Sequence, residues 1–500
     1  MRSKKALYNI IFALLFQIIT IICGFIVPKL IISTYGSSVN GLISSISQFL
    51  AYISLLEAGF GPVIKSVLFK PIAKKNKLEV ERILKSSEKI FKRISYIFII
   101  YIIVLCIILP MIINNFDKLF TLSLIIIISI STFFEYYFGM VYRIYLQAKQ
   151  NNYVISIVQI GTLILNTIMI VLLVKIKASI QIVKLTSSII FLLRPIILNI
   201  YVKRKYKINL KNVDSNYKIK QRWDALAQHI SYILHVNTDV IILTLLSNLK
   251  EVSVYSVYYL ILSSIRNVIC NSFVGGVDSL FGDMIAKDEK DKLNEVFNIY
   301  EGLYITLSTI IFICTFILIV PFVKVYTKGV NDVNYIRYIF AYILTLSELV
   351  CVIRQIYYSL VKVAGHFKQT KKGAIIEALT NIILSIILVF KFGIIGVAIG
   401  TLVSMIIRFI EIAIYTSKNI LNRKLIYIIK RIILITIEFI IIIFINKFIN
   451  INISNYINWI LKALIIFIIS SSIVIIINSI FYKENIKKTI KFINKKIKKM

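Results

Sequence analysis

The sequence of 500 residues has few acidic residues, few prolines and few of the usual metal ligands. Aspartate and glutamate number 23 against 59 lysines and arginines, which gives a formal net charge of +36. Six residues are proline, five are cysteine and three are histidine. Because no CxxC pair occurs and His229, His235 and His366 lack metal-ligand spacing, we expect neither a disulfide framework nor a metal site.

Other signatures are missing as well. No GxxxxGK[ST] segment is present, so this chain is not expected to hydrolyse ATP, and we expect no cofactor. No long polar segment is available to form a soluble domain, which argues against nucleic-acid binding despite the basic charge. The outer connectors expected below are also short, whereas a membrane glycosyl polymerase usually needs an extended loop to hold its acceptor. A transporter is therefore favoured over an enzyme.

The residues that are abundant are apolar: 58% of the sequence is hydrophobic and only 16% is charged. A scan for runs of about 20 apolar residues predicts about fourteen transmembrane helices. The spans lie near 6–34, 40–69, 94–112, 119–142, 153–174, 179–202, 225–246, 252–283, 297–320, 335–361, 374–390, 394–417, 432–446 and 459–482. The fold class predicted is an all-α integral membrane protein.

Lysine and arginine crowd every second connector. Most of the basic residues fall before the first span, in connectors such as 70–93 and 203–222, and in the tail 483–500, whereas the alternate connectors contain few. By the positive-inside rule, both termini are expected in the cytoplasm. No cleavage pattern follows the first apolar stretch, so we interpret it as an uncleaved helix.

Small and polar residues recur along four of the spans at alternating spacings of four and three, which places them on one helix face. In the second span this stripe contains Asn40, Ser44, Ser47, Ala51, Ser54, Ala58, Gly61 and Lys65. Thinner stripes follow the first span (Asn9, Ala13, Gln17, Thr20, Gly24), the seventh (Asp224, Gln228, Ser231, His235, Thr238) and the eighth (Ser256, Tyr259, Ser263, Arg266, Cys270). These spans are the expected walls of a water-filled cavity. Close helix packing in lipid is the alternative for the small residues.

An internal repeat indicates two lobes. Residues 159–194 align with 374–408, so that Asn166 meets Asn381 and Arg194 meets Arg408. We therefore predict a six-helix lobe over 1–210, a second over 211–424, two additional helices within 425–482 and a basic tail over 483–500. The two bundles would be related by a pseudo-two-fold axis along the membrane normal.

Three segments carry a family resemblance: NGLISSISQFLAYISLLEAGFGPVIKSVLFKPIAKKN (40–76), NTDVIIL with EVSVYSVYYLI, and FGDMIAKDEKDK. They resemble the polysaccharide-transporter (Wzx-like) branch of the multidrug/oligosaccharidyl-lipid/polysaccharide exporter superfamily. The resemblance implies twelve core helices in two bundles, with two helices added at the C-terminal end. It also implies a flippase of the bacterial cytoplasmic membrane that moves polyprenyl-diphosphate-linked oligosaccharides for capsule, O-antigen or a related surface glycan, beside glycosyltransferases and a polysaccharide polymerase.

The resemblance also implies a cationic cavity that binds the diphosphate. Its expected members are Lys65 and Arg266 first, then Lys29, Lys184, Arg194, Arg354 and Arg408. Lys29 and Lys184 have an alternative role as snorkelling residues at the membrane interface. Arg143 is expected to close the fourth span at the inner surface. Arg194 and Arg408, the latter with Glu411 three residues on, are alternatively ion pairs inside a lobe.

Four acidic residues in or near the spans are candidates for proton or sodium coupling: Glu57, Asp239, Glu348 and Glu377. Neutralisation of nearby cations is an equally good interpretation. Two other substrates stay open, namely a peptidoglycan precursor or another lipid, and a drug or organic cation exported by an antiporter of the same superfamily. The excess of cations within the spans argues against the antiporter.

Overall fold

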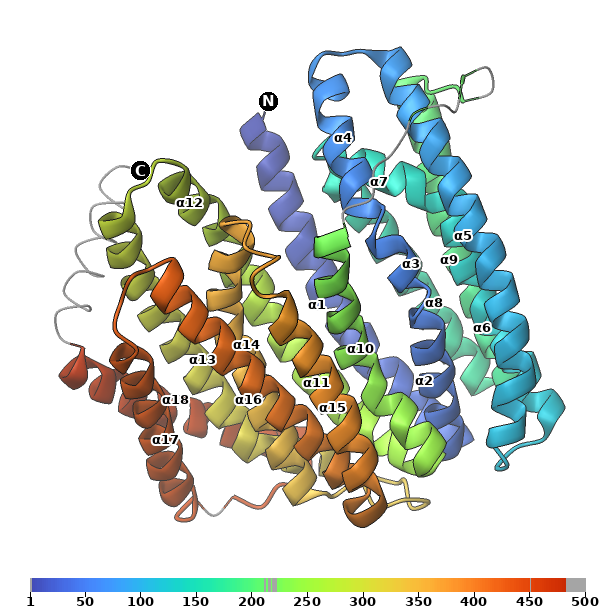
Figure 1. The fold of residues 1–500 in the computed structure, drawn as a ribbon. Helices are drawn as coiled ribbons and strands as arrows, with labels where there is room; N and C mark the ends of the chain where they lie inside the picture. Colours follow the sequence, from blue (N-terminus) through green and yellow to red (C-terminus); the bar gives the residue numbers. More distant parts are fainter. Residues whose placement is uncertain (1, 211–212, 215–216, 218–222, 450, 483–500) are drawn as a thin grey trace. The chain divides into compact units, whose positions relative to one another are not determined.

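The computed structural model describes residues 2–210, 213–214, 217, 223–449 and 451–482, and all regular elements in these ranges are helices (Figure 1). The chain divides into two compact units, Met1–Ser256 and Val257–Met500. The lobe boundary expected at 210 and the separate pair of added helices stay predictions. The tail expected over 483–500 lies outside the described residues.

The first unit consists of long helices with several shorter ones between them. Its elements are α1 (Arg2–Tyr35), α2 (Ser37–Ala51), α3 (Ser54–Ala58), α4 (Gly61–Ala73), α5 (Lys77–Ile112), α6 (Lys118–Phe134), the π-helix η1 (Glu135–Gly139), α7 (Met140–Ala148), α8 (Asn152–Lys175), α9 (Ile180–Tyr206) and α10 (Trp223–Leu246). Helix α11 (Leu249–Ile269) starts in this unit and continues into the second.

Local sequence signals set several of these helix starts. The Asn76 side chain accepts a hydrogen bond from the Glu79 backbone N–H at 3.1 Å and so caps α5, as expected for asparagine at an N-cap.

Helix α1 packs on α8, α8 on α9, and α9 on α6. The apolar core between the helices includes Leu42, Phe91 and Leu124, all fully buried. The bundle therefore holds α6, α8 and α9 side by side.

The second unit continues with helices that pack in the same manner. Its elements after α11 are the π-helix η2 (Cys270–Val274), α12 (Gly275–Ala286), α13 (Lys290–Tyr326), α14 (Tyr338–Val363), α15 (Lys371–Phe392), α16 (Ile394–Asn419), α17 (Ile426–Asn446) and α18 (Tyr456–Phe481). Helix α16 packs on both α14 and α15, and α13 packs on α14 and α18. Phe297, Phe312 and Tyr357 are fully buried in its core.

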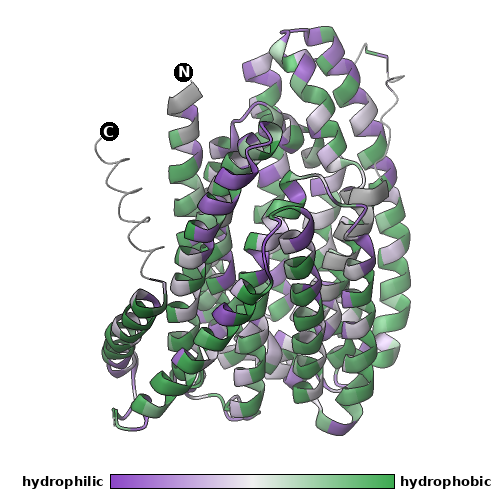
Figure 2. Cartoon of the chain, turned by 60° about the vertical axis from the view of Figure 1, so that its left-hand side comes forward, coloured by the Kyte–Doolittle hydropathy of each residue, from purple (hydrophilic) through white to green (hydrophobic). Residues whose placement is uncertain are grey.

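In the described residues, twelve helices are long and apolar enough to cross a membrane. Helices α10 and α17 occupy the remaining two expected spans, and in α17 the charged residues Lys430, Arg431 and Glu438 interrupt the apolar stretch. Figure 2 shows hydrophobic residues along the helices and hydrophilic residues concentrated towards their ends. Each of the fourteen expected spans coincides with helical structure, and the protein is a multi-pass membrane protein.

Three spans differ from the continuous α-helices that the sequence predicts: the second, the fourth, which passes through η1, and the eighth. The second is interrupted at residues 52–53 and 59–60. Pro62 has no N–H to donate to the carbonyl of residue 58, so the helix breaks just before it. The eighth passes through η2 before continuing as α12. Single-turn π segments of this kind often lie at functional sites in helices.

Candidate functional site

Lys65 lies on α4, which follows the interruption of the second span. Its side chain is half-buried, and no hydrogen bond or ion pair of Lys65 occurs in the part of the chain that the structure describes. A half-buried ammonium group of this kind remains available to an anion. Because α3 and α4 are separated by the turn at 59–60, Lys65 does not lie on one continuous helix with Asn40. The single continuous helix that the sequence predicts for this stripe is therefore interrupted, and a shared face for its residues stays a prediction.

The first part of that stripe includes packing contacts. The Asn40 amide donates to the Ser253 hydroxyl at 2.8 Å, and the Ser45 and Thr244 hydroxyls are 2.6 Å apart. A Cβ atom on Gly41 would lie 1.8 Å from the backbone oxygen of Leu249. Close packing thus explains this end of α2. Ser44, Ser47, Ala51 and Ser54 are more accessible, being half-buried or exposed.

Two further stripes are also partly packing surfaces. In α1 the Asn9 side chain donates to the Gln150 carbonyl and accepts from the Tyr153 backbone N–H, both at 2.9 Å, which ties α1 to the start of α8. In α10, the side chains of Asp224, Gln228, Ser231 and His235 lie outside the described residues. The residues of the stripe in the eighth span, from Ser256 in α11 to Cys270 in η2, are all half-buried. Most other residues of α11 are buried.

Glu57, at the end of α3, is half-buried and accepts a hydrogen bond from the Tyr136 hydroxyl at 2.9 Å. Tyr136 belongs to η1, and the residue before it, Glu135, accepts from the Arg143 guanidinium at 3.3 Å. Thus η1 brings two carboxylates and one arginine into the same part of the first unit.

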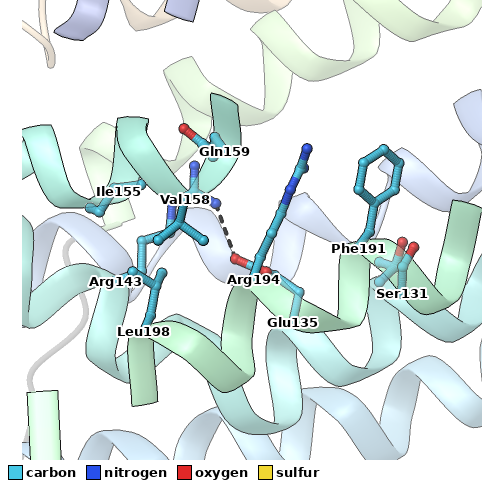
Figure 3. A pocket seen from close by; sticks show the side chains of 10 residues that line it. Ser131, Glu135, Arg143, Ile155, Val158, Gln159, Phe191, Arg194 and Leu198 are labelled. Atoms are coloured by element: carbon cyan, nitrogen blue, oxygen red, sulfur yellow. Dashed lines mark hydrogen bonds and ion pairs between the residues drawn. The ribbon is translucent and has the colours of Figure 1, made fainter. Parts of the chain in front are cut away.

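A pocket of about 230 Å³ lies next to this cluster, between α6, η1, α7, α8 and α9. Figure 3 shows its lining, with the ion pair of Arg143 and Glu135 on one side and the Arg194 side chain extending between Gln159 and Phe191. The Arg194 Nε donates to the Thr162 hydroxyl at 2.8 Å, and the guanidinium stacks 4.1 Å from the Phe191 ring centre. Arg194 is therefore held in a defined orientation at the pocket.

The other predicted members in the first unit are more scattered. Lys29 on α1 and Lys184 on α9 are both half-buried. Lys184 forms no ion pair within the described residues and does not line the pocket. Asp239 is buried and accepts from the Tyr255 hydroxyl at 2.8 Å. The structure therefore brings only Arg194, among the predicted cations, to this pocket.

In the second unit, Arg266 forms a two-pronged contact with Glu348. Its Nη1 lies 2.8 Å and 2.9 Å from the two carboxylate oxygens, and its Nη2 donates to the Tyr259 hydroxyl at 3.2 Å. The sequence placed Arg266 in the substrate site and Glu348 among the coupling residues. Their contact agrees with the neutralising role that the sequence left open for Glu348, and the substrate and coupling roles stay predictions.

Arg354, Glu377 and Arg408 form a second buried network. Glu377 accepts from Arg354 and lies 3.4 Å from the Arg408 Nε. Arg408 also pairs with Glu411 and donates to the Thr370 carbonyl at 2.9 Å. The alternative interpretation of Arg408 as an ion pair inside its lobe is thus confirmed. Glu377 neutralises arginines from α14 and α16.

Charged residues that the sequence analysis overlooked take part in similar contacts. Glu301, within α13, accepts from Arg423 at 3.0 Å and from the Tyr357 hydroxyl. Glu135 lines the pocket described above, as does Arg143, which was expected only at the membrane surface. Both glutamates lie inside expected spans, so the criterion that selected Glu57 and Glu348 would have found them too.

Comparisons with known proteins show the fold. No family model matches the sequence, and no curated protein matches it. Among solved structures, the lipid II flippase MurJ in an inward closed conformation aligns with a TM-score of 0.67 and 18% identity, over 95% of this chain and 100% of that one. The chain has the fold of this flippase.

Two other structures share that fold over less of the chain. An inward-facing multidrug resistance MATE family transporter of the MOP superfamily aligns with a TM-score of 0.59 and 14% identity, over 80% of this chain and 95% of that one. The MATE multidrug transporter DinF-BH aligns with a TM-score of 0.58 and 16% identity, over 82% of this chain and 94% of that one. These structural neighbours are all transporters or flippases.

Proposed function

We propose that this protein is a flippase that moves polyprenyl-diphosphate-linked oligosaccharides across the bacterial cytoplasmic membrane by alternating access. The observation that carries the choice of a lipid-linked substrate is the extent of the structural match, and the family resemblance of residues 40–76 favours an oligosaccharide. The lipid II flippase aligns over 95% of this chain, whereas the MATE transporters align over 80–82%. The difference is about the size of the segment from Ile426 onwards, which contains α17 and α18.

The charges inside the helical units support an anionic substrate. Lys65 is half-buried, and within the described residues it forms no ion pair with a carboxylate. A diphosphate cannot enter hydrocarbon unaided, because burying its charges without partners costs several kcal/mol or more. Lysine and arginine offset that cost by donating charge-assisted hydrogen bonds to phosphate oxygens.

The acidic residues argue against an exporter of organic cations. Glu348 and Glu377 are neutralised by arginines, and Glu57 and Asp239 accept hydrogen bonds from tyrosines. The charges of Glu348 and Glu377 are therefore not available to an organic cation. Coupling to a proton or sodium gradient is proposed at Glu57, since this carboxylate forms no ion pair with an arginine or lysine of the described residues.

The test is transport by the purified protein in proteoliposomes. A fluorescent polyprenyl-diphosphate oligosaccharide is incorporated in both leaflets, and the fraction that becomes accessible to an added glycosidase is followed over time. We expect fast flipping by the wild type and at least tenfold slower flipping by Lys65→Ala, with equal reconstitution. Equal flipping by wild type, Lys65→Ala and protein-free vesicles would contradict the proposal.

A second candidate is a flippase for a peptidoglycan precursor, which the alignment with the lipid II flippase favours. The same assay separates the two when the oligosaccharide substrate and lipid II are compared at equal concentration. Faster flipping of lipid II would select the second candidate. Faster flipping of the oligosaccharide substrate would select the first.

A further inference from the structure

The pocket in the first unit contains more hydrogen-bond donors than its own side chains satisfy. It is lined by two guanidinium groups, Arg143 and Arg194, and one carboxylate, Glu135. Arg143 makes a single contact with Glu135 at 3.3 Å, and Arg194 uses Nε for Thr162. The two terminal amino groups of Arg194 make no hydrogen bond within the described ranges.

Neutral polar groups add to this excess of donors. Gln159 and Thr132 both line the pocket, and neither makes a side-chain hydrogen bond within the described part of the chain. Phe191 lies beside the Arg194 guanidinium, whose central carbon is 4.1 Å from the ring centre (Figure 3). A guanidinium edge presents paired donors that match two oxygens of a phosphate or carboxylate.

The nearby charges do not cancel the positive charge of the lining. Besides Glu135, the carboxylate that interacts with Arg143 is that of Glu57. Glu57 does not line the pocket, and it accepts the Tyr136 hydroxyl at 2.9 Å. The groups that face the pocket therefore have one more positive than negative charge. A cation whose charge lies among apolar helices is stabilised when a counter-charge occupies the space beside it.

We propose that this pocket is a binding site for a phosphate group, with Arg194 as its main ligand and Arg143 and Gln159 as further donors. The pocket's volume of about 230 Å³ accommodates a phosphate with several attached atoms or waters. The phosphate is either inorganic phosphate or the head group of an anionic phospholipid. The site lies wholly within the first unit, and its occupation does not depend on the proposed transport function.

The experiment measures ligand-dependent thermal stability of the full chain in lipid nanodiscs. One arm adds inorganic phosphate to nanodiscs of neutral phosphatidylcholine, and the other replaces part of that lipid with phosphatidylglycerol. An increase in Tm with inorganic phosphate identifies the free ion as a ligand, and an increase with phosphatidylglycerol alone identifies the lipid head group. No increase in either arm overturns the proposal.

Arg194→Gln and Lys184→Gln form a matched pair, since both remove one half-buried cation from α9 but only Arg194 lines the pocket. We expect Lys184→Gln to respond as the wild type does. In Arg194→Gln the apparent affinity should fall about tenfold or more, as expected when a charge-assisted contact is lost. An equal response of Arg194→Gln and wild type would refute the site.

A second variant covers the case in which Arg194→Gln does not fold. Gln159→Leu removes a pocket donor and keeps both arginines and the Arg194 contact with Thr162. We expect a severalfold weaker response to whichever phosphate source stabilises the wild type. A response identical to that of the wild type would remove Gln159 from the site and contradict the proposed donor set.

Discussion

The cations that the sequence selected as candidate ligands have different partners in the two units. In the second unit Arg266, Arg354 and Arg408 each contact a glutamate, and Arg423 contacts Glu301. In the first unit, Lys65 and Lys184 form no ion pair among the described residues. Arg194, which the sequence alignment pairs with Arg408, bonds a threonine, whereas Arg408 bonds carboxylates.

This difference separates structural charges from available ones. A buried arginine with a carboxylate partner offers no net charge to a ligand, and breaking its pair is costly. A half-buried cation without such a partner keeps its charge available. The candidate site residues are therefore better sought in the first unit, even though both units contain cations that the sequence selected.

The largest effect is expected from Glu377→Leu, which leaves Arg354 and Arg408 buried without this carboxylate. We expect a loss of about 3–5 kcal/mol in the free energy of unfolding, because an uncompensated charge stays buried. Unfolding of the purified protein by denaturant in detergent measures the loss. The double variant Glu377→Leu/Arg354→Leu should lose less than Glu377→Leu alone; an equal or larger loss would contradict the pairing.

The next effect is expected from Arg266→Gln. The Glu348 carboxylate then stays buried beside the neutral glutamine side chain, and it loses the contacts of both its oxygens with the arginine. The coupling energy with Glu348→Gln should be about 1–3 kcal/mol in a double-mutant cycle. Thermal unfolding of the four proteins in the cycle gives this value. Strictly additive losses would show that the two residues stabilise the protein independently.

A smaller loss is expected from Tyr136→Phe in the first unit. The change removes the hydroxyl that donates to Glu57 at 2.9 Å and keeps the aromatic ring. A hydrogen bond contributes about 0.5–1.5 kcal/mol to stability. Denaturant unfolding should show a loss in this range. Tyr137→Phe, at the neighbouring half-buried position of η1, is the control and should lose less, because the Tyr137 hydroxyl bonds to the exposed Tyr96 and not to a carboxylate.

The smallest effect on stability is expected from Lys65→Ala and Lys184→Gln. Neither side chain forms an ion pair in the described residues, so removing its charge should change the free energy of unfolding by about 0.5 kcal/mol or less. Thermal unfolding checks this expectation. If either variant were as unstable as Glu377→Leu, the contrast between the two units would be lost.

The sequence predicted the number and place of the helical spans well, because apolar runs of membrane-spanning length are a local property. It also predicted the partnership of Arg408 with Glu411, which are three residues apart on one helix. It did not predict the break before Pro62 as a separate helix, nor the π segments η1 and η2. Such interruptions depend on the pattern of backbone hydrogen bonds, which the spacing of side chains in a stripe does not reveal.

The contacts of the other charged residues could not be predicted from the sequence. Glu377 contacts Arg354, which lies on a different helix 23 residues earlier in the sequence. Tyr136 contacts Glu57, which lies 79 residues earlier. No periodicity relates such positions. The pocket around Arg194 likewise needs several helical elements to pack together.

The amino-acid sequence by itself determined that the chain is a helical membrane protein with an excess of positive charge, since hydropathy and charge add up residue by residue. Only the tertiary structure decided which of those charges are neutralised and which remain available. The free energy of a buried charge depends on the groups within a few ångströms of it, and helix packing brings those groups together from distant parts of the chain.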